Sequence, residues 1–238
     1  MKTSKLVTFG CSWTAGVGAC YEPGMSNGEY ESIHKEEGGF SFRSIISNHF
    51  GIENVNFAVK GSSNQRQFRL AEDYDFEDCI VLWGITSTSR FEVWNNEKSK
   101  YKDLFMTADP TWIKPDVLDY IRFTRERFYD HDQEVKRLES RMKHWNHYFK
   151  SIGVKNYWFD TLNHHDYRVD NMIELGNPRD LLSRLSNCDD KTYHYSHFKM
   201  DCDRIHIAEK KGLVNPYSFH PTKKGHKIIA DWFIPWLS

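Results

Sequence analysis

A serine near the N-terminus is the first residue whose type and setting could do chemistry. A short apolar run at residues 6–9 predicts a buried strand, and Gly10-Cys11-Ser12 follows it directly. Glycine accepts backbone angles that other residues avoid, so a strand can turn sharply into a helix here. Such a turn places the Ser12 hydroxyl at the carboxyl end of a sheet, where ligands of open α/β folds bind. The alternative is that Ser12 only caps the helix.

A histidine near the other end of the chain is the matching candidate base. A His-Pro pair at His220 precedes residues 222–237, where apolar side chains recur at helical spacing after a possible cap, Thr222. A serine after the first strand and a His-Pro before the last helix resemble the first and last blocks of the SGNH (GDSL-like) hydrolases. Residues 56–63 and 84–87 resemble the two interior blocks of that family, so the resemblance spans nearly the whole chain.

The resemblance implies the chemistry of a serine esterase. Acyl transfer needs a nucleophile, a base that takes its proton, and hydrogen-bond donors that hold the oxyanion. The first two blocks imply that Ser12 is the nucleophile and that the N–H groups of Ser12 and Gly61 are oxyanion donors. Gly61 is also a suitable turn residue, and both roles can hold at once. Cys11 stands where the family usually has Asp.

The third block of the family usually supplies an Asn side chain as a further oxyanion donor, and here Thr86 stands at that position. A Thr hydroxyl can donate a hydrogen bond, although its reach is shorter than that of an amide. Removal of one oxyanion donor typically lowers turnover about 10²–10³-fold. Thr86 is the predicted third donor, with Ser87, Asn64 and Arg90 as the alternatives.

The last block of the family, Asp-x-x-His, has two competing matches. Asp203 and His206 have the spacing itself, whereas His220 has Tyr217 three residues upstream. We favour His220 as the base, because the helix that follows it anchors it beside the first strand. Loss of an orienting carboxylate lowers turnover substantially without abolishing it. Asp203 is the predicted orienting partner of His220; the alternatives are Asp201, Asn215, a backbone carbonyl, or a Ser–His dyad without a carboxylate.

Residues outside these blocks could contact a substrate. Asn64 and Arg90 follow predicted strands, and Trp13 could stack on a sugar ring. Arg90 could clamp a carboxylate or phosphate, although a surface ion pair is the default interpretation. Histidine clusters at 164–166 and 194–197 contain side chains that bind zinc. With 12 histidines in the chain such pairs arise readily, so loop surface is the favoured interpretation. We expect no metal and no cofactor.

Composition narrows the class of protein. The chain has 238 residues, 39% of them hydrophobic, with 32 basic and 33 acidic residues. We therefore expect one domain with a full core, and neither nucleic acid nor an anionic membrane as a partner. Five scattered cysteines without CxxC spacing suit reduced thiols in a cytoplasmic protein. We expect no signal peptide and no membrane-spanning segment, because no apolar run has the required length.

An α/β fold would position these residues. Apolar patterns predict strands at 6–9, 55–59, 79–83 and 154–159. They predict helices at 42–50, 65–74, 117–151, 178–185 and 222–237, and the helix at 117–151 is expected to break near 129–132. Strands alternating with helices predict a three-layer α/β/α sandwich with a mostly parallel central sheet, SGNH/flavodoxin-like, as a single domain over residues 1–238. Irregular excursions are expected at 17–39, 91–116 and 160–211.

The leading hypothesis is a serine hydrolase that acts on an ester of a small or carbohydrate-like molecule through an acyl-serine intermediate. Transfer of the acyl group to a hydroxyl, an O-acyltransferase activity, is the nearest alternative. The departures at Cys11, Thr86 and Tyr217 also fit a catalytically degenerate binding or structural protein, because fold alone does not establish function. A metal hydrolase is the third hypothesis.

Overall fold

The computed structural model describes residues 3–33, 39–105, 114–162, 167, 169–175, 180–187 and 203–238. The strands are β1 (Lys5–Phe9), β2 (Glu53–Asn56), β3 (Cys79–Ile85), β4 (Arg90–Asn95), β5 (Lys100–Phe105) and β6 (Lys155–Asp160). The helices are α1 (Ser12–Ala15), α2 (Asn27–Ile33), α3 (Phe42–Phe50), α4 (Asn64–Glu72), α5 (Pro115–Arg127), α6 (His131–Ile152), α7 (Leu181–Ser186), α8 (Asp203–Lys210) and α9 (Lys223–Leu237).

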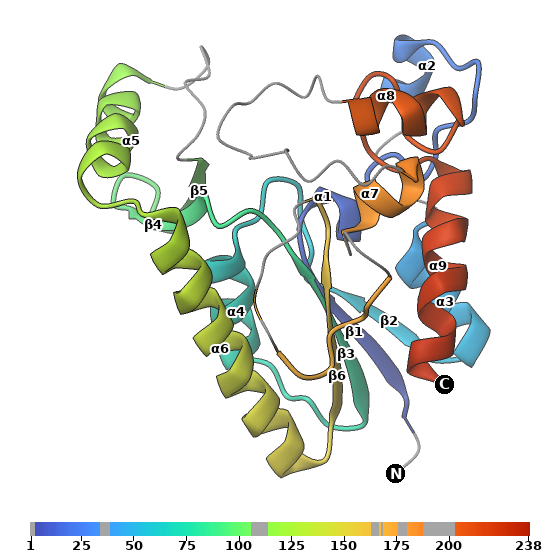
Figure 1. Cartoon of the computed structure of the whole chain (residues 1–238), viewed down its shortest axis with the longest axis horizontal. Helices are drawn as coiled ribbons and strands as arrows, with labels where there is room; N and C mark the ends of the chain where they lie inside the picture. Colours follow the sequence, from blue (N-terminus) through green and yellow to red (C-terminus); the bar gives the residue numbers. More distant parts are fainter. Residues whose placement is uncertain are drawn as a thin grey trace.

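Four strands form a parallel sheet in the order β2-β1-β3-β6. Val7 of β1 is aligned with Val55 of β2 on one side and with Val81 of β3 on the other. β3 in turn pairs with β6 along its length. Because all four strands run the same way, their carboxyl ends share one edge of the sheet. Ser12 follows β1 at that edge, which is drawn at the top of the sheet in Figure 1.

Both faces of the sheet are buried, and successive residues of a strand alternate between them. In β3, Ile80 and Leu82 belong to the core on one face, and Val81 and Trp83 belong to the core on the other. A strand covered on both faces is apolar throughout rather than alternating. This explains the uninterrupted apolar run from which β3 was predicted.

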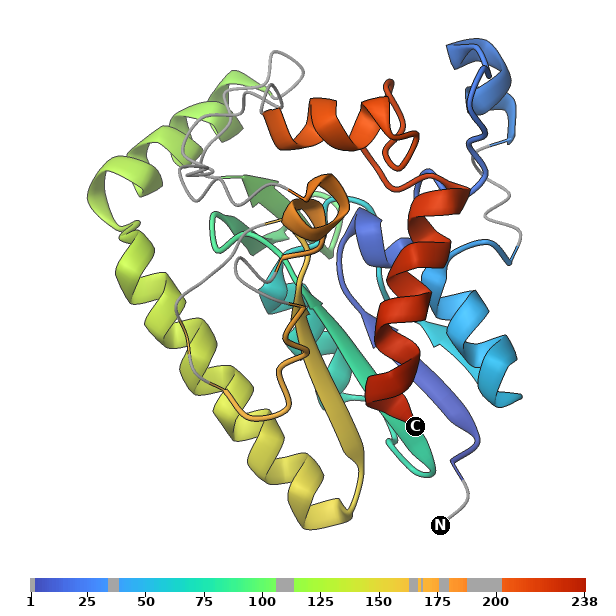
Figure 2. The same ribbon diagram turned by 45° about the vertical axis from the view of Figure 1, so that its right-hand side comes forward.

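Helices α3 and α9 cover one face of the sheet, and α4 and α6 cover the other (Figure 1). Figures 1 and 2 both show α9 alongside α3. A helix at the C-terminal end of the chain thus packs beside one from its first quarter. The predicted α/β/α arrangement with a parallel central sheet is therefore confirmed.

Side-chain caps start two of these helices. At the start of α4 the Ser63 side chain accepts a hydrogen bond from the Arg66 N–H, and Thr222, the predicted cap, accepts one from the Gly225 N–H at the start of α9. The predicted break near 129–132 is confirmed, because α5 ends at Arg127 and Asp130 caps α6. None of the helices within the described residues combines the length and apolar character that crossing a bilayer requires.

The stretches expected to be irregular contain regular elements. Residues 90–105, most of which fall in the predicted irregular stretch 91–116, form the antiparallel hairpin β4–β5, because Phe91 and Val93 pack with Leu104 and α5 on one face. The 17–39 stretch includes α2, and the 160–211 stretch includes α8 as well as α7. β2 lies at Glu53–Asn56 rather than 55–59, because pairing with β1 sets its register.

Candidate active site

Ser12 is the first residue of α1, directly after β1. The turn is tight: a Cβ on Gly10 would lie 2.1 Å from Thr14 Oγ1, and one on Gly84 of β3 would lie 2.2 Å from the same atom. The two glycines therefore let α1 rest directly on two neighbouring strands, with the Thr14 side chain between them. This packing holds Ser12 at the carboxyl edge of the sheet, where the residue is 6% exposed.

The side chains of Ser12 and His220 are in contact. His220 Nε2 lies 2.7 Å from Ser12 Oγ, across 208 positions of sequence, and both residues are buried. The competing histidine is elsewhere: His206 lies on the surface of α8, where its Nδ1 is 3.5 Å from Glu209. Of the two matches to the last block, the structure brings His220 and not His206 to the serine.

Hydrogen bonds within the loop hold His220 in place. The Asn215 N–H donates to the His220 carbonyl, and the Phe219 N–H donates to the Asn215 carbonyl, each at 2.8 Å. Phe219 has a φ of +56°, in the left-handed region that bulky residues rarely adopt. The Thr222 N–H then donates to the Leu213 carbonyl at 3.0 Å and closes the loop before α9. The sequence shows only that this loop precedes a helix.

Gly18 packs against the backbone that carries His220. A Cβ on Gly18 would lie 2.6 Å from the Pro221 carbonyl oxygen and 3.0 Å from His220 Cβ. The φ of Gly18 is +92°, a conformation that side chains other than hydrogen disfavour. The chain just after α1 therefore forms one wall of the histidine loop, which only a glycine can do at this distance.

Burial keeps the imidazole of His220 neutral. Its pKa is lowered to about 3, first by burial and then by the positive charge of Lys60, with a smaller effect of Arg90; a hydrogen bond to the Ser218 backbone acts in the opposite direction. A neutral imidazole beside a hydroxyl can accept the hydroxyl proton. The pair can therefore work as nucleophile and base at neutral pH.

The group that orients His220 is not placed by the described residues. Asp203 is the first residue of α8, but its side chain lies outside the part of the chain that the structure describes, as does Asp201. Among the described residues, His220 Nδ1 is buried and has no partner in hydrogen-bond geometry, whereas the Ser218 backbone acts on the ring and favours its protonated form. The orienting role of Asp203 stays a prediction.

The turn that carries Gly61 lies against the turn that carries Ser12. The Val59 N–H donates to the Gly10 carbonyl at 3.3 Å, and Gly61 has a φ of +79°. Among the described residues, nothing accepts a hydrogen bond from the N–H of Ser12 or of Gly61. Both groups predicted to hold an oxyanion are thus left with their donors available, and their role stays a prediction.

Asn64 holds the backbone of Thr86 through two hydrogen bonds. Its Nδ2 donates to the Thr86 carbonyl at 2.9 Å, and its Oδ1 accepts from the Thr86 N–H at 3.0 Å. The amide therefore positions the third block, and Thr86 Oγ1 is buried without a hydrogen-bond partner in the described part of the chain. The role of Thr86 as the third oxyanion donor stays a prediction.

Trp13 and Cys11 both face the interior. Trp13 is 2% exposed and belongs to the core that α3 and α9 cover, so it offers no open ring for a sugar, contrary to the expectation. Cys11, at the position where the resembled family usually has Asp, is buried with its Sγ 3.8 Å from Thr161 Oγ1. The residue before the serine therefore packs against the end of β6.

Two basic residues stand near the Ser–His pair. Arg90 is 8% exposed, its Nη1 is 3.5 Å from the Ser62 carbonyl, and its guanidinium lies 5.0 Å from the centre of the Phe105 ring. Lys60, whose charge also acts on His220, was not predicted as a site residue. Its position directly before Gly61, a predicted oxyanion donor, could have indicated that it lies near the site.

No group of three or more His, Cys, Asp or Glu side chains that could hold a metal occurs in the residues that the structure describes. The two histidine clusters considered from the sequence, 164–166 and 194–197, lie outside them.

Comparison with known proteins finds similarity among solved structures. No family model and no curated protein matches this chain. A protein assigned to the G-D-S-L lipolytic family from Desulfitobacterium hafniense is 14% identical, with a TM-score of 0.36, over 98% of this chain and 99% of its own. An acetyl xylan esterase from Butyrivibrio proteoclasticus is 10% identical, with a TM-score of 0.48, over 100% of this chain and 64% of its own. An acetylxylan esterase from Geobacillus stearothermophilus is 17% identical, with a TM-score of 0.42, over 100% of this chain and 97% of its own.

The class of protein follows from the fold and the geometry of the site. This is an α/β protein in which the carboxyl edge of a parallel sheet carries a buried serine in contact with a neutral histidine from the other end of the chain.

Proposed function

We propose that the chain is a serine esterase of the SGNH (GDSL-like) type that hydrolyses an ester of a small or carbohydrate-like molecule. The observation that carries this proposal is the 2.7 Å contact between Ser12 Oγ and His220 Nε2. A serine hydroxyl is a weak nucleophile unless a base within hydrogen-bond reach takes its proton.

In the first half of the reaction, Ser12 Oγ attacks the carbonyl carbon of the ester while His220 Nε2 takes the hydroxyl proton. The carbonyl oxygen becomes an oxyanion, which the N–H groups of Ser12 and Gly61 and the Thr86 hydroxyl stabilise. The tetrahedral intermediate collapses, the C–O bond to the alcohol breaks, and His220 returns the proton to the leaving oxygen. The alcohol departs and an acyl-Ser12 ester remains.

In the second half, His220 takes a proton from water, which attacks the acyl carbon. Collapse of this intermediate breaks the bond to Ser12 Oγ, returns the proton to the serine and releases the acid. If a sugar hydroxyl replaces water, the same steps give acyl transfer. The ratio of transferred to hydrolysed acyl group, measured with a sugar acceptor present, distinguishes an O-acyltransferase from a hydrolase.

Labelling by a fluorophosphonate probe tests the proposal, because the probe reacts with a serine that a base has activated. The wild-type protein is expected to be labelled at Ser12, and Ser12→Ala is expected to abolish labelling. His220→Gln is expected to slow it about 10²–10⁴-fold, the usual contribution of a general base. Peptide mapping by mass spectrometry locates the label.

His206→Gln is the matched control, because it removes the other candidate histidine, which lies on the surface of α8. It is expected to leave the labelling rate unchanged. Absence of both labelling and turnover over a broad panel of esters in the wild-type protein would contradict the proposal and favour a binding or structural protein.

A further inference from the structure

An arginine-lined cavity lies beside the proposed esterase site. It has a volume of about 180 Å³ and is open between α4 and α6. Its polar and charged lining consists mainly of Asn64, Thr88, Arg90, Glu134, Arg137 and Arg141. Among the lining residues that the structure describes, three are arginines and one is an acid, Glu134, which pairs with Arg137. This described part of the lining therefore carries more positive than negative charge.

The cavity is tied to the candidate oxyanion site through two residues. Asn64, on its wall, holds the Thr86 backbone at 2.9 and 3.0 Å. Arg90, also on its wall, reaches the carbonyl of Ser62, the residue after Gly61. The charge of Arg90 also contributes to lowering the pKa of His220. The cavity therefore shares two of its walls, Asn64 and Arg90, with the turns that carry Thr86 and Gly61.

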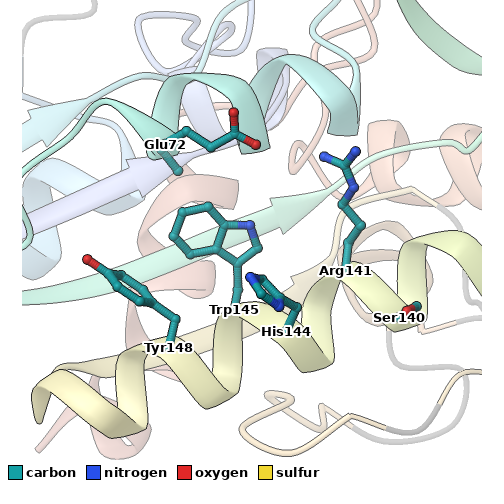
Figure 3. Close-up of a pocket in the computed structure, with 7 residues that line it drawn as sticks. Glu72, Ser140, Arg141, His144, Trp145 and Tyr148 are labelled. Carbon is teal, nitrogen blue, oxygen red and sulfur yellow. The ribbon is translucent and has the colours of Figure 1, made fainter.

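Two arginines approach the cavity from different elements. Arg90 begins β4, and its buried guanidinium stacks near Phe105. Arg141 rises from α6 toward α4, where its guanidinium lies 5.8 Å from the centre of the Phe68 ring. Figure 3 shows the Arg141 side chain pointing from α6 toward α4 at the end of a second, larger cavity of about 560 Å³. A guanidinium carries five N–H donors in a fork that fits the oxygens of a carboxylate or phosphate.

The geometry points to an anion-binding subsite in this cavity, in which Arg90 and Arg141 hold a carboxylate or phosphate group of the ester substrate. This inference rests on the proposed esterase function and names the class of ester that it prefers. At about 180 Å³ the cavity is smaller than the roughly 300–1,000 Å³ of sites that enclose a whole drug-sized ligand. It suits a compact anionic group rather than a complete substrate.

Steady-state kinetics on matched esters test the subsite. The probes are a neutral nitrophenyl acyl ester, the equivalent ester with a terminal carboxylate, and one with a terminal phosphate. The wild-type protein is expected to show a kcat/KM at least about tenfold higher for one of the anionic esters, the value of one charge-assisted hydrogen bond. Which of the two is preferred identifies the group. The preference is expected to fall as ionic strength rises.

Arg141→Gln and Arg90→Gln are each expected to reduce the preference about tenfold. Arg141 is exposed on α6, so its replacement leaves a folded protein even if loss of the buried Arg90 does not. Lys136→Gln is the matched control, an exposed cation on the same helix outside the cavity, and it is expected to keep the preference. Equal kcat/KM for neutral and anionic esters, or a preference that both arginine variants retain, would overturn the subsite.

Binding of inorganic phosphate separates this inference from the proposed function. Thermal unfolding of the wild-type protein is measured against phosphate concentration at constant ionic strength. The unfolding midpoint is expected to rise as phosphate saturates the site. Arg141→Gln is expected to raise the phosphate concentration needed for half of this effect about tenfold. If the wild-type protein binds phosphate in this way but has no esterase activity, the anion site stands and the proposed esterase function is contradicted. If the protein is an active esterase that neither binds phosphate nor prefers anionic esters, only the anion site is contradicted.

Discussion

Gly18 shows how one residue type controls the position of the candidate base. It combines a left-handed φ of +92° with an approach that leaves no space for a Cβ beside His220. Gly24 has a similar φ of +98° but nothing within 4 Å of its would-be Cβ. The two glycines therefore share the backbone requirement and differ in the steric one.

Gly18→Ala is expected to slow fluorophosphonate labelling about 100-fold, because displacement of a catalytic group by about 1 Å can have that effect. Gly24→Ala is the control: it has the same strain, about 1 kcal/mol or somewhat more, without the clash. It is expected to lower the free energy of unfolding by about 1–2 kcal/mol, less than Gly18→Ala does, while the labelling rate changes less than about twofold. Equal labelling rates in the two variants would show that Gly18 does not position His220.

At the scale of elements, the β4–β5 hairpin braces the turn that leads into α4. The Asp103 carboxylate of β5 accepts a hydrogen bond from the Ser63 N–H at 2.9 Å, two residues after Gly61. Arg69 of α4 donates from two nitrogens to the Glu92 carboxylate of β4, at 2.8 and 2.7 Å. Burial raises the pKa of Asp103, and the bond from Ser63 opposes that rise. The hairpin therefore fixes α4 and the turn before it.

Glu92→Gln is expected to lower the free energy of unfolding by about 1–2 kcal/mol, because it breaks a two-bond ion pair whose carboxylate is 6% exposed. Urea unfolding measures this. Asp231→Asn provides the comparison, since it breaks the Lys227–Asp231 pair of α9, in which both side chains are more than half exposed. That change is expected to cost less than about 0.5 kcal/mol. Similar losses in both variants would mean that the hairpin contact adds no more than a surface pair.

At the scale of the whole molecule, two buried histidines mark where the ends of the chain meet. His226, on the first turn of α9, accepts a hydrogen bond at Nδ1 from the Phe42 N–H of α3 at 3.3 Å. Its pKa is lowered to about 3, mainly by burial, as is that of His220. The packing of α9 on α3 that seats His220 thus also encloses a second neutral imidazole.

The free energy of unfolding is expected to fall as the pH falls from about 6.5 toward 3. An unfolded histidine binds a proton near pH 6.5, whereas these two bind one in the folded state only near pH 3. Between those values the unfolded chain holds more protons, so acid favours it, by up to about 1.4 kcal/mol per pH unit for each histidine. The slope falls to half near pH 6.5 and disappears by about pH 7.5.

Urea unfolding at pH 5 to 6.5 measures this slope. His226→Gln is expected to remove about half of the histidine contribution, because a Gln carbonyl can still accept from the Phe42 N–H but does not titrate. Lys227→Gln, an exposed neighbour on α9, serves as the control and is expected to leave the slope unchanged. An unaltered slope in His226→Gln would show that His226 titrates normally in the folded protein.

Local chemistry in the sequence determined much of the fold. The apolar run of β3, the cap Thr222 and the break before α6 depend on neighbouring residues, so patterns reveal them. The hairpin β4–β5 was missed, because Phe91 and Val93 are only half-buried and their face is completed by α5, a helix later in the chain. Likewise β2 was placed a few residues late, since its register depends on its partner β1.

For the candidate site, the sequence by itself determined the residue types: a serine after the first strand, a glycine after the second and two histidines in the last block. Only the tertiary structure decided that His220 rather than His206 meets Ser12, that Trp13 is enclosed in the core, and that Arg90 faces a cavity with Arg141. The physical reason is distance along the chain. Contacts across 208 residues are set by how α9 packs on α3 and the sheet, and no local pattern encodes that packing.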